Sequence, residues 1–200
     1  MTTILPSPLT GCAALLAAWI LIGLAGLLRS SSVRFAGRTL FPLGALLGLA
    51  LAALAGSSLL AGGTERLVLP LGLPDLPFHL RLDPLSSLFL LLLGASSAGV
   101  SVFAGGYFRQ GEGTAPGLLC LQYHLFLASM GWVLLADDAY GFMVAWEVMA
   151  LSSYFLVTTQ HRIPEIRRAG FIYLLMAHLG AIAILLSFGV LQGGSWQFTF

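Results

Sequence analysis

Six long apolar stretches divide this sequence, and they constrain its fold more than any other feature. Soluble domains average about 25% charged residues, whereas this chain has 8% charged and 58% hydrophobic residues. A helix needs about 20 apolar residues to cross the hydrocarbon core of a bilayer. We therefore predict an all-α membrane protein forming a single transmembrane domain over residues 1–200. The six predicted transmembrane helices span about 9–28, 39–62, 84–104, 116–136, 139–159 and 169–191.

The arginines predict how these helices are oriented, because the chain contains no lysine. If the N-terminus lies outside, the inner loops contain seven arginines and the outer loops contain two. Short cytoplasmic loops carry an excess of Lys and Arg, so this distribution places the N-terminus outside, in a multi-pass protein of the inner (plasma) membrane. The predicted inner arginines are Arg29, Arg34, Arg38, Arg109, Arg162, Arg167 and Arg168, and the outer ones are Arg66 and Arg81.

The predicted outer segment between the second and third helices differs from the rest of the chain. Residues 65–71 and 78–83 alternate polar and apolar side chains, and the link between them contains Gly72 and Pro74. This pattern is typical of two strands joined by a turn. A two-stranded hairpin is marginally stable alone. We therefore expect a short outer β-hairpin that docks over the ends of the helices.

One acidic residue, Glu147, interrupts the fifth apolar stretch, which reads DDAYGFMVAWEVMALSSYFLVTT over residues 137–159. It lies about eight residues from the predicted outer edge, roughly 12 Å along a helix and near mid-membrane. Insertion scales put the cost of an acidic residue there near 3 kcal/mol, so such a residue normally faces a protein interior or a water path. The functional hypothesis competes with a structural one, in which a protonated glutamic acid bonds a neighbouring helix.

Two histidines, His124 and His178, are expected at a similar depth in the fourth and sixth helices. Glutamate and histidine are residue types of intramembrane proton relays, because each takes up and releases a proton. Depth alone does not decide whether the three side chains face one another, and a single buried histidine also suits a packing role. The polar residues expected to support the relay are Gln122, Tyr123, Ser152, Ser153, Tyr154 and Tyr173.

Motifs for other chemistry do not occur in the sequence. It lacks the HExxH pattern of zinc peptidases, a phosphate-binding loop, and the CxxC and CxxCH patterns of clusters and haem. Its two cysteines, Cys12 and Cys120, both fall in apolar stretches, and its net charge of +1 does not indicate nucleic-acid binding. We expect no cofactor, no metal and no catalytic residue.

Three segments resemble a known family: RLDPLSSLFLLLL, AWEVMALSSYFLV and RRAGFIYLLMAHLG. They are similar to the antiporter-like proton-translocating membrane subunits of respiratory NADH:quinone oxidoreductase, multisubunit sodium/proton antiporters and membrane-bound hydrogenases. The MAHLG ending most resembles the large membrane subunit of the hydrogenase-4 and formate hydrogenlyase type. The resemblance implies that Glu147 is a key proton-channel residue. It also implies a longer subunit with a lysine on a later helix, so this chain is expected to be its N-terminal part.

The expected function is therefore that of a proton-translocating membrane subunit, or its N-terminal part, in a redox-driven complex. Its expected partners are the lipid bilayer, other membrane subunits and a peripheral redox module, and it is expected to have no active site of its own. One alternative is a structural membrane anchor that conducts nothing. Another is a sodium/proton antiporter subunit, because the residues do not choose between the two ions.

Overall fold

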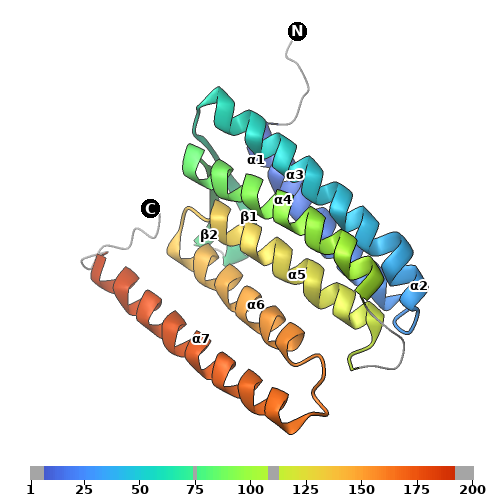
Figure 1. Ribbon diagram of the computed structural model, residues 1–200. Helices are drawn as coiled ribbons and strands as arrows, with labels where there is room; N and C mark the ends of the chain where they lie inside the picture. The colour runs from blue at the N-terminus through green and yellow to red at the C-terminus, as the bar shows by residue number, and fades with distance from the viewer. Residues whose placement is uncertain (1–6, 74–75, 108–112, 192–200) are drawn as a thin grey trace.

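Six long helices form the body of the protein in the computed structural model, which describes residues 7–73, 76–107 and 113–191 (Figure 1). The predicted link at 74–75, the loop containing Arg109 and the residues after 191 lie outside this part of the chain. The elements in chain order are α1 (Pro8–Leu27), α2 (Val33–Phe35), the π-helical η1 (Ala36–Leu40), α3 (Phe41–Ala61), β1 (Glu65–Leu73), β2 (Leu76–Leu82), α4 (Pro84–Tyr107), α5 (Pro116–Leu135), α6 (Ala139–Val157) and α7 (Pro164–Leu191).

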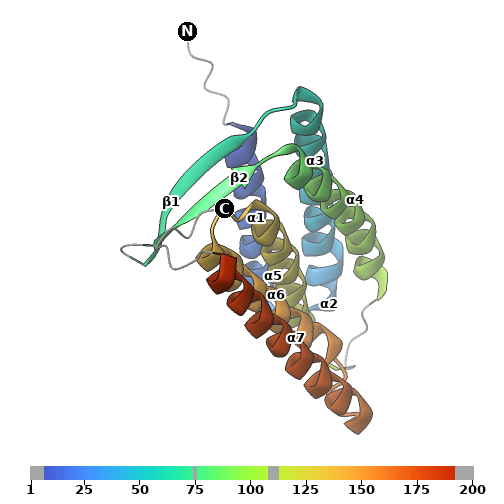
Figure 2. The same cartoon turned by 90° about the vertical axis from the view of Figure 1, so that its left-hand side faces the viewer.

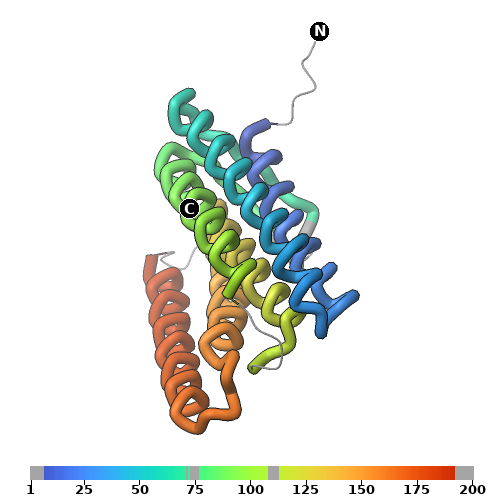
Figure 3. The backbone as a smooth tube through the Cα atoms, turned by 45° about the vertical axis from the view of Figure 1, so that its right-hand side comes forward, coloured from blue at the N-terminus to red at the C-terminus, as the bar shows by residue number. Residues whose placement is uncertain are grey.

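The long helices lie side by side and alternate in direction (Figures 1 and 3). α3 packs against α4, α1 packs against α5, and α5 packs against α6. α7 lies at the edge of the bundle beside α6 (Figure 1). Six helices of the described chain are long and apolar enough to cross a membrane, with α2, η1 and α3 forming one continuous span. The predicted all-α membrane fold is confirmed.

Two helices begin before the apolar spans that were predicted for them. The second span was predicted to begin near residue 39 but begins at Val33, where the Ser32 side chain caps the helix by accepting a 3.2 Å hydrogen bond from the Phe35 amide. The π-helical turn η1 then connects this first turn to α3. The sixth span was predicted from about residue 169, and the sequence also indicated a helix start at Pro164. The helix α7 does begin at Pro164, with Glu165 in its first turn. Charged first turns lack the apolar signal from which the two spans were predicted.

Close backbone contact between α3 and α4 depends on paired glycines. A Cβ atom placed on Gly94 would lie 2.6 Å from both the amide nitrogen of Ala52 and the carbonyl oxygen of Gly48. A Cβ atom on Gly48 would lie 2.8 Å from the Gly94 carbonyl oxygen. Small residues let transmembrane helices approach until their backbones touch, which maximises van der Waals packing where no hydrophobic force acts.

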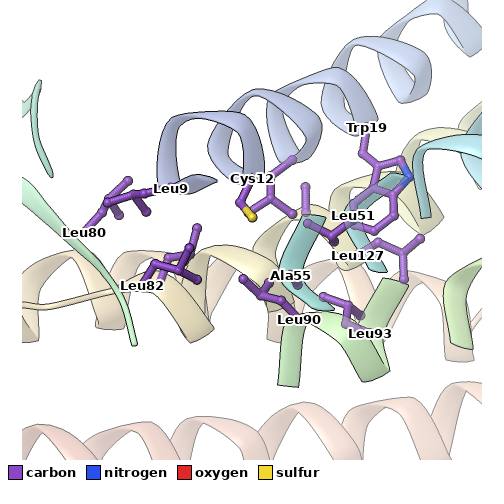
Figure 4. Packing of buried hydrophobic residues seen from close by; sticks show 13 residues of the cluster. Leu9, Cys12, Trp19, Leu51, Ala55, Leu80, Leu82, Leu90, Leu93 and Leu127 are labelled. Carbon is purple, nitrogen blue, oxygen red and sulfur yellow. The ribbon is translucent and has the colours of Figure 1, made fainter. Parts of the chain in front are cut away.

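The buried core lies where α1, α3, α4 and α5 meet (Figure 4). Trp19 of α1 is fully buried, and its indole N–H donates a 3.2 Å hydrogen bond to the Gly44 carbonyl oxygen of α3. Leu51, Leu90 and Leu127 belong to the same cluster and come from the three other helices. This cluster excludes lipid from the space between the first four spans.

The predicted β-hairpin is present as the antiparallel pair β1 and β2, which crosses one end of the bundle (Figure 2). We call this the hairpin end. The amide of Leu9 donates to the Glu65 carboxylate over 2.8 Å, which ties β1 to the start of α1. The Asp137 amide donates to the His79 carbonyl oxygen over 2.8 Å, which ties β2 to the turn between α5 and α6. That this end lies outside the cell stays a prediction.

Carboxylates of the α5–α6 turn strengthen this connection. Asp137 is nearly buried and pairs with Arg66 of β1 at 3.4 Å and with Arg81 of β2 at 3.1 Å. Asp138 caps α6 by accepting from the Gly141 amide at 2.6 Å, and its other oxygen accepts from the His79 amide at 2.7 Å. A single side chain thus holds both a strand and the start of a helix.

We predict that Gly94→Ala destabilises the helix bundle, whereas Gly99→Ala on the same helix does not. The methyl group added at position 94 would meet the α3 backbone, and overpacking of this kind costs about 1–3 kcal/mol. Nothing lies within 4 Å of a Cβ atom at Gly99, so this control should change stability by less than about 0.5 kcal/mol. Denaturant titration in a mild detergent measures both. Equal stabilities of the two variants would contradict the proposed backbone contact.

Candidate functional site

Glu147 lies in the middle of α6, on the side that faces α7. The helix begins at Ala139 because Asp138 caps it. Glu147 is therefore about 12 Å along the axis from that start. Its side chain is 37% exposed within the described chain. The predicted mid-helix placement of this carboxyl is thus observed, and its neighbour on α7 is polar.

That neighbour is His178, whose Nε2 atom lies 3.5 Å from a carboxylate oxygen of Glu147. Its Nδ1 atom lies 2.9 Å from the Leu174 carbonyl oxygen. A carbonyl oxygen only accepts, so Nδ1 carries a hydrogen and Nε2 is the atom that takes up or releases a proton. The second ring nitrogen therefore faces a carboxylate oxygen of Glu147.

A second polar contact joins the same two helices closer to the start of α7. The Tyr173 hydroxyl donates a 2.9 Å hydrogen bond to the Ser153 hydroxyl oxygen. Ser153 is six residues beyond Glu147, about 9 Å along α6. Hydroxyl groups both donate and accept, so they pass protons along hydrogen-bonded chains. Two of the six predicted supporting residues, Ser153 and Tyr173, are therefore placed along the interface that contains Glu147 and His178.

His124 lies elsewhere, within the packed part of the bundle. Its ring is fully buried on α5 and packs against Phe41 of α3, with 5.7 Å between ring centroids. Nδ1 lies 2.8 Å from the Cys120 carbonyl oxygen, while Nε2 touches Gly44 and has no hydrogen-bond partner among the described residues. The structure therefore brings together Glu147 and His178 but turns His124 toward α3, and its part in a relay stays a prediction.

The other four predicted supporting residues, on α5 and α6, do not all face the same neighbour. The Tyr123 hydroxyl lies 3.0 Å from the Ser101 hydroxyl of α4, on the opposite side of α5 from α6. Gln122 and Ser152 line a groove between α5 and α6. The Ser152 hydroxyl donates to the Val148 carbonyl oxygen of its own helix at 2.7 Å. Tyr154 packs its ring beside Gly170 of α7.

The groove between α5 and α6 has a volume of about 840 Å³ and was not predicted. Apolar side chains form most of its wall, and Gln122 contributes a buried amide oxygen with no hydrogen-bond partner in the described chain. His161 and Arg167 lie at its far end, near the turn between α6 and α7. The sequence does contain a signal for it, because Leu118, Leu121, Gln122 and Leu125 recur at the spacing of one helix face.

The α6–α7 interface brings one carboxyl and one imidazole together. Within the described residues, no group of three His, Cys, Asp or Glu side chains comes together as a metal site. The Glu147 carboxylate instead meets the imidazole of His178. Their Oε2 and Nε2 atoms lie 3.5 Å apart, and both groups are of types that take up and release a proton.

The sequence of this chain is similar to parts of several longer proteins. The chain is 40% identical over 129 residues to an uncharacterised protein of Mycobacterium tuberculosis, covering 63% of this chain and 20% of that protein. It is 33% identical over 121 residues to hydrogenase-4 component B of Escherichia coli, a match that covers 60% of this chain and 18% of that protein. It is 31% identical over 162 residues to NADH-quinone oxidoreductase subunit L of Mycobacterium tuberculosis, a match that covers 74% of this chain and 25% of that protein. The matched regions thus span about a quarter or less of each relative.

Solved membrane complexes share the fold. A chain of the archaeal membrane-bound sulfane sulfur reductase superposes with a TM-score of 0.72 at 18% identity, covering 93% of this chain and 28% of that one. A chain of the Mrp complex from Dietzia sp. superposes with a TM-score of 0.72 at 24% identity, covering 96% of this chain and 20% of that one. No protein-family model matches the sequence. The resemblance is nevertheless confirmed by these relatives: the chain is homologous to part of the antiporter-like membrane subunits of the hydrogenase-4 and NADH-quinone oxidoreductase type.

Proposed function

We propose that this chain is a proton-translocating membrane subunit, or a part of one, in a redox-driven complex. The observation that carries the proposal is the contact between Glu147 and His178, with 3.5 Å between carboxylate oxygen and imidazole Nε2. Because Nδ1 is engaged by a backbone carbonyl, the two facing atoms hold one proton between them in the neutral pair. Moving that proton converts a neutral pair into an ion pair without moving either helix.

Energetics support a switchable pair at this depth. An isolated carboxylate is costly inside hydrocarbon, whereas a carboxylate beside an imidazolium is partly compensated. The neutral and ionised forms of the pair then lie closer in energy than either residue alone would allow. A charge change elsewhere in a complex needs to supply only that smaller difference to shift the proton.

The Tyr173–Ser153 contact supports a route between this pair and the end of the bundle where α7 begins. The four side chains belong to two helices that lie side by side (Figure 1). The roughly 9 Å of helix between Ser153 and Glu147 is longer than one hydrogen bond, so water molecules must complete the route. The Glu147 and His178 side chains are both partly exposed within the described chain, which leaves room for them.

The proposed setting is a larger assembly in the inner (plasma) membrane, with the N-terminus outside. The matched regions cover only 18% of hydrogenase-4 component B and 25% of subunit L. This supports the proposal that residues 1–200 correspond to one portion of a longer subunit. Other membrane subunits and a peripheral redox module are the partners we propose. A non-conducting anchor is the rival hypothesis, and it requires no titratable pair at mid-membrane.

Glu147→Gln should reduce coupled proton uptake to below about a tenth of the unmodified rate. Glutamine keeps the shape and hydrogen-bonding capacity of the side chain but cannot exchange a proton. Proton uptake by membrane vesicles containing the assembled complex measures the rate, and a native gel shows whether the complex is intact. Glu165→Gln, at an exposed carboxyl in the first turn of α7, is the matched control.

An intact Glu147→Gln complex that pumps normally would favour the anchor hypothesis. Repeating the measurement with and without sodium identifies the ion, because a sodium/proton antiporter stops without sodium whereas a proton pump continues.

Tyr173→Phe should slow proton uptake by about two- to tenfold, the barrier increase expected from one lost hydrogen bond. The phenylalanine ring retains the packing of α7 on α6 and removes only the hydroxyl that reaches Ser153. Tyr140→Phe is the control, because Tyr140 packs its ring on Phe78 at the hairpin end with 5.5 Å between centroids. Equal rates for these two variants would exclude the Tyr173 hydroxyl from the route.

A further inference from the structure

A basic cleft lies at the end of the bundle opposite the hairpin. It has a volume of about 990 Å³ and is formed by the α1–α2 loop, the first turns of the second span and the last turn of α4. Arg29, Arg34 and Arg38 line it together with the serines at 30–32. The cleft contains none of the residues of the α6–α7 interface.

The loop that forms one wall of the cleft is held in place by backbone hydrogen bonds. The Ser30 carbonyl oxygen accepts a 2.8 Å hydrogen bond from the Gly117 amide at the start of α5. The Ser32 amide donates to the Arg29 carbonyl oxygen over 3.0 Å. The Arg29 guanidinium lies over the Phe35 ring, 5.7 Å from its centroid. The cleft therefore does not need a ligand to order its wall.

Two glycines, Gly37 and Gly105, also line the cleft. A Cβ atom on Gly37 would lie 2.7 Å from the Gly105 carbonyl oxygen, so side chains are excluded where these two helices touch. Gly37 belongs to the π-helical turn η1, and π-helical turns frequently occur at functional sites. The lining of the cleft therefore combines the backbone of these glycines with three cationic side chains.

The three arginines have no internal counter-charge in the described chain. None of them forms an ion pair with a described carboxylate, whereas Arg66 and Arg81 at the hairpin end both do. No acidic residue of the described chain lines the cleft. The planar guanidinium group matches the geometry of phosphate oxygens and binds them with two parallel hydrogen bonds. The cleft therefore has the charge and chemistry of a phosphate site.

The surface beside the cleft indicates the source of the phosphate. Leu28, Leu24 and Leu21 lie along one face of α1 and the residue that follows it, and 82%, 47% and 66% of their surfaces are exposed. A phosphate bound in the cleft would thus continue into an apolar surface that acyl chains can cover. The positive-inside prediction places this end in the leaflet that is rich in anionic lipids.

We propose that this cleft binds the phosphate of an anionic glycerophospholipid whose acyl chains lie along α1. The proposal does not depend on the proton-transfer function, because neither Glu147 nor His178 takes part in it. Its ligand is a structural lipid that neutralises the arginines and fills the junction of the first three spans.

The test compares lipid binding to the purified full chain in detergent by native mass spectrometry, with phosphatidylglycerol and phosphatidylcholine as the two probes. The unmodified chain should prefer phosphatidylglycerol. The double variant Arg34→Gln/Arg38→Gln should weaken phosphatidylglycerol binding at least about tenfold. The matched control Arg162→Gln/Arg168→Gln removes two exposed arginines at the same end and should change binding less than about twofold. Circular dichroism checks that each variant retains its helices.

Several outcomes would overturn the proposal. Equal binding of the two lipids by the unmodified chain would mean that acyl chains alone bind, and this arm does not depend on a variant folding. Equal losses in the two double variants would indicate diffuse surface charge. Displacement of phosphatidylglycerol by millimolar inorganic phosphate would assign the cleft to the free anion. Unchanged lipid binding together with failed complex assembly in the cleft variant would assign it to an acidic partner protein.

Discussion

Peptide groups inside hydrocarbon have no water to bond, so a chain that crosses a bilayer must satisfy them within its own helices. In this protein the six long helices of the described chain meet that requirement, and the β-hairpin is confined to an end of the bundle. Helix interfaces then differ in how closely the backbones pack and in which polar side chains meet between the helices. The α3–α4 interface uses backbone contact at Gly48 and Gly94, whereas the α6–α7 interface uses side-chain contacts between polar residues.

This division bears on the proton transfer that we propose. The first four spans enclose the cluster of Trp19, Leu51, Leu90 and Leu127, a closely packed region of apolar side chains. Proton transfer needs both polar groups and access, and the α6–α7 interface has Glu147, His178, Ser153 and Tyr173 in a more exposed setting. The buried ring of His124 shows the contrast, because the same residue type in the packed region is held by Phe41 and Gly44.

Helix number, approximate bounds and the hairpin could be predicted from the sequence, because they follow from hydropathy and from alternation of polar and apolar residues. The positions of Glu147 and His178 along their helices could be predicted as well, because they depend only on the rise per residue. The direction in which each side chain faces could not be predicted. A helix rotates about 100° per residue, so residues at nearly the same depth can face different neighbours. Gln122 and His124 differ by about 200°, so one faces α6 and the other faces α3. The start at Val33 depends on a serine cap within a charged segment, where hydropathy is uninformative, whereas the proline and the following glutamate do indicate the start at Pro164.

The carboxylate of Asp138 joins two mechanical parts, since it caps α6 and also holds the amide of His79 in β2. Through it, the helix that carries Glu147 is clamped to the β-hairpin and to its neighbour α5. α7 has no such clamp in the described chain and packs mainly on α6. Glu147 therefore belongs to a helix that is tied to the β-hairpin, whereas His178 belongs to a helix that packs mainly on α6. The distance between the Glu147 and His178 side chains is therefore set mainly by how α7 packs on α6.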